Sequence, residues 1–233
     1  MTVSSAPGAS STTKDLRFNN AGAFTVTLSG TNIINTGGIL VGSTVAGNVS
    51  TITGGSLTSG DTNADGTHDL IIIDNNTGSG NIVINSAIVD NGVPTGITEG
   101  ATTLSTVTSS LVLGGANSFT GPSSIDGGSV ELNNASAWGG DGNLTFAPRG
   151  NISYAGAAGT FTLNGNSISV SGLATTMLGF NPVVQNANAS AVTLTLNPSN
   201  SMSYNGTLKD GTGGGKLGVA MTGTGTQLSL IHI

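Results

Sequence analysis

The composition of this 233-residue chain is dominated by small and polar residues: 38 are glycine, 7% are charged and 4% are aromatic. Its net charge of −6, with only five Lys and Arg residues, excludes the basic surface that nucleic acid requires. No apolar run approaches the roughly 20 residues that cross a bilayer, and without cysteine there is no disulfide framework. Because 36% of the residues are hydrophobic and recur with a period, the composition predicts many short strands joined by tight turns.

Short segments of alternating apolar and polar residues follow one another along the chain. In chain order they are FTVTL (24–28), STITGGSL (50–57), NIVINSAIV (81–89), NLTF (143–146), NISYAG (151–156), TFTLNGNSISVSGL (160–173) and VTLTL (192–196). They recur at intervals of roughly eight to twelve residues, separated by Asn-Gly, Gly-Gly or Asp-Gly turns. Abundant β-branched residues and frequent glycine disfavour helices. The chain is therefore predicted to be all-β.

One motif recurs with the pattern Gly-x-Asn followed by Thr-Gly. TLSGTNIINTG (27–37) aligns with VLGGANSFTG (112–121), and LNPSNSMSYNG (196–206) is a weaker copy. Three asparagines hold the same position in it: Asn32, Asn117 and Asn200. They are predicted to lie at corners and to form hydrogen-bonded ladders between stacked coils. A parallel β-helix, or solenoid, fits this repeat and fills its core with aliphatic and small residues; the alternative, a β-sandwich, does not require the repeat.

The segment LVLGGANSFTGPSSIDGGSVELNNASAWGG (111–140) resembles the autotransporter-associated β-strand repeat. The typical form of that repeat is a Leu-Thr-Leu-like strand, then Gly-Ala-Asn-Thr-Tyr-Thr-Gly, then a Gly-Thr-Leu strand. Five residues match it directly: Gly115, Ala116, Asn117, Thr120 and Gly121. Ser118 and Phe119 replace Thr and Tyr. Segments 16–41 and 69–92 are similar to the regions that flank this repeat in large bacterial surface proteins.

The resemblance implies a right-handed parallel β-helix from an autotransporter passenger, located outside a bacterium or on its outer-membrane surface. The expected function is that of a structural stalk segment in adhesion, aggregation or matrix formation, without catalysis. Its expected partners are neighbouring repeats of a longer chain, host or matrix glycans, or other copies of itself. The alternative is an extracellular β-helix protein that binds or cleaves polysaccharide, in which Trp138, Tyr154 and Tyr204 would stack on sugars.

The two ends of the chain indicate a fragment. Residues 1–16 have neither a basic nor an apolar leader segment, so no signal peptide is predicted. The last six residues, LSLIHI (228–233), translate a transposase end sequence that is used to tag sequencing libraries. The natural β-helix region is therefore expected to comprise residues 1–227 here and to continue beyond Gln227.

A calcium-loop pattern lies in DTNADGTHDLIII (61–73). Five residues hold the ligand positions 1, 3, 5, 7 and 9 of such a loop: Asp61, Asn63, Asp65, Thr67 and Asp69. Gly66 allows the sharp turn, and the oxygens suit a hard cation. Position 12 is Ile72 instead of the bidentate Glu, so a solvated turn is the alternative. Calcium is the one cofactor that the sequence indicates, and its role would be to fix the loop.

Residues suited to catalysis are scattered. His68 and Asp69 are neighbours in sequence and should point to opposite faces of a strand. Three acids lie near one another in sequence: Asp126, Glu131 and Asp141. A glycosidase needs such a carboxylate pair, but eleven acids are spread through the chain and chance explains this proximity. Arg149 is the only base placed to serve a lyase. No catalytic residue is therefore predicted.

Overall fold

The structure, a computed structural model, describes residues 9–77, 80–100, 111–140, 142–146, 159–176 and 180–229. Within these ranges it is all-β, with strands β1 to β24 and one short 3-10 helix, η1 (Ser43–Val45), but no α-helix. Every strand pairing is parallel. The parallel β-helix is thereby confirmed, and the β-sandwich, whose sheets are antiparallel, is wrong.

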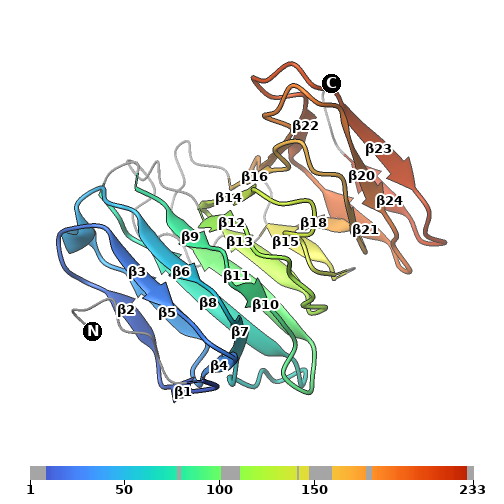
Figure 1. Cartoon of the computed structure of the whole chain (residues 1–233). Coiled ribbons are helices and arrows are strands. Elements are labelled where there is room, and N and C mark those ends of the chain that lie inside the picture. The colour runs from blue at the N-terminus through green and yellow to red at the C-terminus, as the bar shows by residue number, and fades with distance from the viewer. Residues whose placement is uncertain are drawn as a thin grey trace.

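Successive coils stack from the N-terminal to the C-terminal end, and their strands lie on three faces, although some coils have no described strand on the first face (Figure 1). The first face holds sheets A and D: β1 (Thr12–Thr13), β4 (Thr31–Ile34), β7 (Ser56–Ser59), β10 (Ala87–Ile88), then β17 (Ile168–Val170), β20 (Val192–Leu196), β23 (Leu217–Met221). The second holds sheets B and E: β2 (Leu16–Phe18), β5 (Gly38–Val41), β8 (His68–Asp74), β11 (Thr95–Gly100), β13 (Ser123–Asp126), β15 (Leu144–Phe146), β18 (Leu173–Thr175), then β21 (Met202–Tyr204), β24 (Gln227–Ser229). The third is sheet C: β3 (Phe24–Thr27), β6 (Ser50–Thr53), β9 (Ile82–Ile84), β12 (Leu111–Leu113), β14 (Ser129–Leu132), β16 (Thr160–Thr162), β19 (Val183–Gln185), β22 (Thr207–Lys209).

The predicted strands agree with the observed ones wherever the structure describes them. FTVTL contains β3, NLTF contains β15, and VTLTL coincides with β20. The predicted strand NISYAG (151–156) lies outside the described residues, as do residues 230–233.

The core consists of rows of inward-pointing side chains that run from coil to coil. One row of sheet C joins register partners of five successive strands, all of them buried: Val26, Ile52, Ile84, Leu113 and Leu132. Neighbouring strands lie about 4.8 Å apart, so each of these side chains packs against those directly above and below it. Burial of each such side chain contributes roughly 1.5–3 kcal/mol. The alternation seen in the sequence is therefore the alternation between core and surface.

Two glycines of the repeated motif allow a close approach between coils. Gly37 has a φ of +67°, and a side chain there would overlap the backbone carbonyl of Asp69. At Gly121, a Cβ atom would lie 2.5 Å from the backbone nitrogen of Gly96 in the neighbouring coil. The motif ends in glycine because the backbone of the neighbouring coil occupies the space that a side chain would need.

Asn117 of the motif is a buried corner residue that joins three coils. Its Oδ1 accepts a hydrogen bond from the backbone N–H of Ile88 at 2.7 Å, and its Nδ2 donates to the carbonyl of Ala137 at 2.5 Å. Both partners lie in adjacent coils, so the side chain adds to the backbone hydrogen bonds from Asn117 N–H to the carbonyl of Ser136 and from Ser118 N–H to the carbonyl of Ile88, on a part of the first face that has no described strand.

The predicted asparagine ladder is wrong for these positions. Asn32 is buried too, but its register partner is Leu57, whose own partner is Ile88. Two hydrophobic residues therefore separate Asn32 from Asn117 along the first face. Asn200 is exposed, and its Nδ2 donates only to Ser199 Oγ, at 3.4 Å. Each asparagine thus serves its own corner and does not pair with the others.

Because Asn117 is buried and Asn200 is exposed, replacing each with alanine should change the free energy of unfolding by different amounts. Asn117→Ala should lower the free energy of unfolding by about 1–3 kcal/mol, because it leaves a buried N–H and a buried carbonyl without a partner. Asn200→Ala, the matched control from the same motif, should change it by less than about 0.5 kcal/mol. Urea unfolding of both variants provides the measurement. Equal losses would mean that Asn200 is also a buried corner residue.

Candidate functional site

The loop predicted to bind calcium lies between β7 and β8 and closes on itself through hydrogen bonds. The backbone N–H of Asn63 donates to the carbonyl of Thr67 at 2.8 Å, and that of Gly66 donates to the carbonyl of Asn63 at 3.0 Å. Asp65 Oδ1 accepts from the backbone N–H of Thr67 at 3.0 Å and from Thr67 Oγ1 at 2.7 Å. Gly66 has a φ of +80°, which explains why glycine occupies the turn.

Several ligand positions of the loop already have protein partners. The hydrogen bonds from Thr67 hold the pKa of Asp65 below its usual value. Asp69 belongs to β8, and its Oδ2 accepts a hydrogen bond from Thr98 Oγ1 at 2.8 Å. Among the described residues, no three His, Asp or Glu side chains gather closely enough to hold a metal ion. Calcium binding by Asp61, Asn63, Asp65, Thr67 and Asp69 therefore stays a prediction.

The geometry of this loop sets an expectation for its calcium affinity. Calcium would compete with the two hydrogen bonds that Asp65 Oδ1 accepts from Thr67, and position 12 lacks the bidentate Glu, so binding should need calcium near the millimolar range of extracellular modules, roughly 10⁻⁴–10⁻³ M. Melting curves should therefore be unchanged at micromolar calcium. Asp65→Asn is the control variant for any shift at higher calcium. A stabilising shift at micromolar calcium would show that the loop rearranges into a preformed site.

A second group of acids is buried along the second face; the sequence analysis considered Asp126 of this group but missed Asp74 and Glu99. Asp74, Glu99 and Asp126 end or nearly end the strands β8, β11 and β13, and they are 2%, 2% and 5% exposed. Asp74 Oδ1 accepts a hydrogen bond from the backbone N–H of Asn76 at 2.9 Å, and Asp126 Oδ1 accepts one from Ser124 Oγ at 2.6 Å. Three successive coils therefore each contribute one buried carboxyl group.

Glu99 is the most confined of these acids. Its register partners are Ile72 on one side and Ile125 on the other, so it occupies a position in a row of the hydrophobic core. Its carboxyl group lies against Gly128 in the turn between β13 and β14, where any side chain would overlap it. Its Oε2 has no hydrogen-bond partner among the described residues. The spacing Ile97-x-Glu99 was the available signal, since residues two apart on a strand share a face.

The surroundings of Glu99 favour its protonated form. Burial is the largest cause and raises the pKa of Glu99 well above 4.5; the negative charges of Asp74 and Asp126 raise it further, and a hydrogen bond from the N–H of Gly128 opposes them. Such shifts are frequent at functional sites but also occur in structural clusters. Glu99 does not line either of the two cavities that the structure describes, one beside Trp138 and the other at the C-terminal end. We therefore interpret Glu99 as a structural, uncharged core residue.

The raised pKa of Glu99 predicts how stability depends on pH. The folded state holds this proton more tightly than the unfolded state, so its contribution is complete below about pH 4.5 and is lost as pH rises through the folded-state pKa. Glu99→Gln should remove this loss, and its melting temperature relative to wild type should rise between pH 4 and pH 8. Glu131→Gln, the same change on the outer side of β14, is the control and should show no such trend. Parallel pH profiles for wild type and Glu99→Gln would contradict a buried, protonated Glu99.

The other sequence candidates do not form a catalytic arrangement in the described part of the chain. His68 and Asp69 are consecutive residues of β8, and Asp69 Oδ2 accepts a hydrogen bond from Thr98 Oγ1. Asp126 lies in sheet B, whereas Glu131 lies in sheet C and accepts a hydrogen bond from Asn164 at 3.1 Å. Asp141 and Arg149 fall outside the described residues.

An open cavity of about 410 Å³ lies beside Trp138 on the first face. Sheet A ends at β10 and sheet D begins at β17, so the coils between them have no described strand on this face. The Trp138 ring packs edge-on against Phe119, with 5.4 Å between centroids, and against Phe161, with 4.9 Å. The remaining lining comes from small and hydroxyl residues: Thr120, Gly139, Gly140 and Ser169. Of the other two predicted sugar-stacking aromatics, Tyr204 is buried and lines the cavity at the C-terminal end, and Tyr154 lies outside the described residues.

In comparisons with known proteins, no family model, curated protein or solved structure matches this chain. The resemblance of residues 111–140 to the autotransporter-associated repeat therefore stays a prediction. In the described residues, no helix has the length and apolar character needed to span a membrane.

Proposed function

We propose that this chain is a structural stalk segment, the passenger-like part of a secreted or surface-displayed bacterial repeat protein, without catalytic activity. The observation that carries the proposal is sheet C, in which eight parallel strands from β3 to β22 form one continuous ladder. Further coils extend such a ladder by repeating the same pairing, so length is gained without new chemistry.

The surface chemistry supports a role in contacts with uncharged material. Outward positions of sheet C carry hydroxyl side chains in register, such as Thr25 beside Thr51. Only 7% of the chain is charged, so a strongly charged polymer would find few partners on it. Adhesion, self-association or matrix formation through hydrogen-bonding faces fits this surface better than electrostatic capture does.

The proposed location is the extracellular space or the outer-membrane surface of a bacterium. The proposed partners are neighbouring repeats of a longer chain, host or matrix glycans, or other copies of the chain. Support comes from residues 111–140, because Asn117 and Gly121 of the motif occupy corners where one coil meets the next. The motif thus behaves as the unit of a stacked coil.

Surface display tests this proposal. We expect cells of a non-aggregating bacterial host to settle faster, or to bind matrix-coated surfaces, when an autotransporter translocator barrel displays the chain on them. Cells that display an unrelated domain of equal size are the control. Cells that neither settle nor adhere, although antibody labels the chain on their surface, would contradict the adhesive role. Release of reducing sugar from polysaccharide would contradict the absence of catalysis.

One observation favours the alternative function, a β-helix protein that binds or cleaves polysaccharide. The cavity beside Trp138 offers an aromatic side chain next to hydroxyl groups, as sugar binding requires. Trp138 is the only tryptophan of the chain, so its fluorescence reports on this cavity alone. In a separate titration with polysaccharides, the purified chain should show unchanged emission if it is a stalk, and a saturable shift if the alternative holds.

A further inference from the structure

The chain contains three Asn-Gly pairs, and the fold gives each a different environment. They are Asn91-Gly92, Asn164-Gly165 and Asn205-Gly206. Asparagine is a thermolabile residue, because its side-chain amide can be attacked by the backbone nitrogen of the next residue. Glycine in that next position leaves the nitrogen unhindered, since it has no side chain. The three pairs share this chemistry, so differences in their reactivity should come from the fold.

In Asn164-Gly165, hydrogen bonds hold both of the groups that would react. The backbone N–H of Gly165 donates to Asn186 Oδ1 at 3.0 Å, and Asn164 Nδ2 donates to Glu131 Oε1 at 3.1 Å. Both bonds have to break in a local opening before the nitrogen can attack the side chain. The folded state should therefore slow the reaction of this pair.

Asn205-Gly206 is confined by packing. Gly206 is buried, and a side chain there would overlap the backbone carbonyl of Pro182. Asn205 Oδ1 is also buried. The crowded intermediate of an attack on the Asn205 amide has no room at this position, so the folded state should protect this pair as well.

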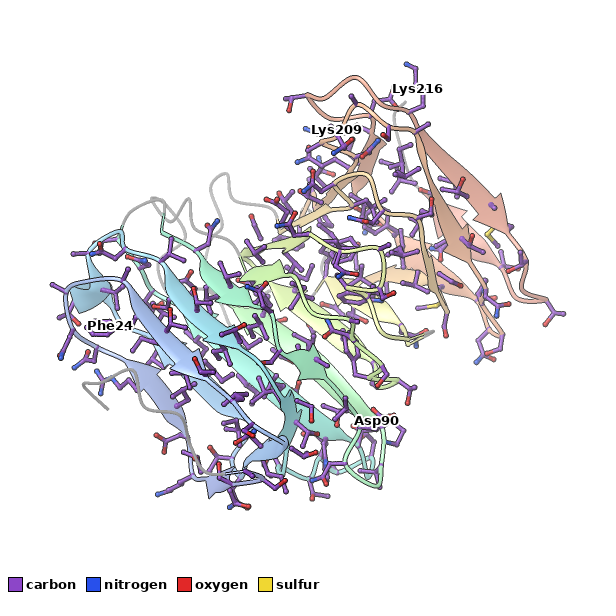
Figure 2. All side chains as sticks on the ribbon, in the orientation of Figure 1. Phe24, Asp90, Lys209 and Lys216 are labelled. Carbon is purple, nitrogen blue, oxygen red and sulfur yellow. The ribbon has the colours of Figure 1, made fainter. Side chains whose placement is uncertain are left out.

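Asn91-Gly92 is the open pair. Gly92 is exposed, has a φ of +77°, and has no atom within 4 Å of the position that a Cβ would take. Its N–H donates no hydrogen bond in the described part of the chain. The Asn91 side chain is held by one hydrogen bond, from Nδ2 to the carbonyl of Ser59 at 3.0 Å. Asp90, the preceding residue, lies at a corner of the β-helix (Figure 2).

We propose that Asn91 is a site of spontaneous covalent modification, where attack by the Gly92 nitrogen and hydrolysis convert asparagine into aspartate or isoaspartate. First, a bond forms between Gly92 N and Asn91 Cγ, the Cγ–Nδ2 bond breaks, and ammonia leaves with the proton from Gly92 N. One water molecule then adds to either carbonyl carbon of the five-membered imide and breaks its bond to Gly92 N. Water is the only co-reactant. This inference goes beyond the stalk function and does not depend on it.

The modification would weaken a contact between coils. Asn91 Nδ2 is a donor to the carbonyl of Ser59 in β7, and a carboxylate in its place can only accept. The new negative charge would also lie beside Asp90, whose carboxylate accepts hydrogen bonds from Thr95 and Thr120. The modified chain should therefore unfold at a lower temperature than the unmodified chain.

Mass spectrometry of proteolytic peptides from the whole chain, aged in mildly alkaline buffer, measures the modification at each pair. In the folded chain, Asn91 should react about tenfold faster than Asn164 or Asn205, because those pairs must first lose the contacts that hold them. In urea, where the fold is absent, the three pairs should react at similar rates. The unfolded chain is thus the internal control for the local sequence.

Three variants separate the contributions of the fold. Glu131→Ala removes the partner of Asn164 Nδ2 at a half-buried position, and it should speed the reaction of Asn164 by about two- to five-fold without changing that of Asn91. Asn91→Gln keeps an amide but would need a six-membered ring, so modification at position 91 should be lost. Asn91→Asp carries the charge of the product and should melt at a lower temperature than freshly prepared wild type.

Three results would overturn the inference: equal rates at Asn91 and Asn164 in the folded chain, an Asn91 that reacts only in urea, or the same order of rates in urea as in the folded chain. The last result would mean that local sequence, and not the fold, sets the reactivity. An unchanged melting temperature of Asn91→Asp would contradict the weakened contact between coils. The stalk function would survive each of these results, and loss of adhesion in the display experiment would leave this chemistry unaffected.

Discussion

Parallel backbone pairing between coils is the constraint on which the rest of this structure depends. A single coil cannot bury its own inward side chains, since the coils above and below are needed to cover them. Val26, Ile52 and Ile84 become core residues only because β3, β6 and β9 pair in register. A shift of one residue in any ladder would move the apolar set of that strand to the surface. Register between coils is therefore the quantity that the sequence has to specify.

Where a ladder is interrupted, a side chain takes over its function. Sheet B ends at β18 and sheet E begins at β21, and the amide of Gln227 spans this break. Its Oε1 accepts a hydrogen bond from the N–H of Leu173 at 3.0 Å, and its Nε2 donates to the carbonyl of the same residue at 2.9 Å. On the first face, the amide of Asn117 also joins adjacent coils through Ile88 and Ala137, in addition to the backbone hydrogen bonds there. Side-chain amides suit this task because they carry the same donor and acceptor groups as the backbone.

Sequence periodicity was sufficient to predict the strands and the parallel β-helix, but not the depth of individual polar residues. Alternation and turn residues are local, so FTVTL and VTLTL could be assigned as strands without knowledge of their partners. Asn117 and Asn200 look alike in the motif, yet only the first is buried, because depth depends on which coils stack on it. Glu99 shows the same limit, since its burial arises from Ile72 and Ile125 in other coils. The residue types of the loop at 61–69 predicted a calcium site, with a solvated turn as the alternative, but the hydrogen bonds that close the loop depend on backbone geometry and could not be read from the sequence.

Only 7% of the residues are charged, and individual charged side chains help to fix the register between coils. Asp90 lies at a corner of the helix (Figure 2), where its Oδ1 accepts hydrogen bonds from the N–H groups of Thr95 at 2.7 Å and Thr120 at 3.0 Å, and its Oδ2 accepts one from Thr120 Oγ1 at 2.7 Å. Thr95 and Thr120 belong to successive coils, so one carboxylate fixes the register between them. Aliphatic rows alone tolerate a shift by a whole coil, because Val, Ile and Leu are nearly interchangeable in them. Charges at single positions remove that degeneracy.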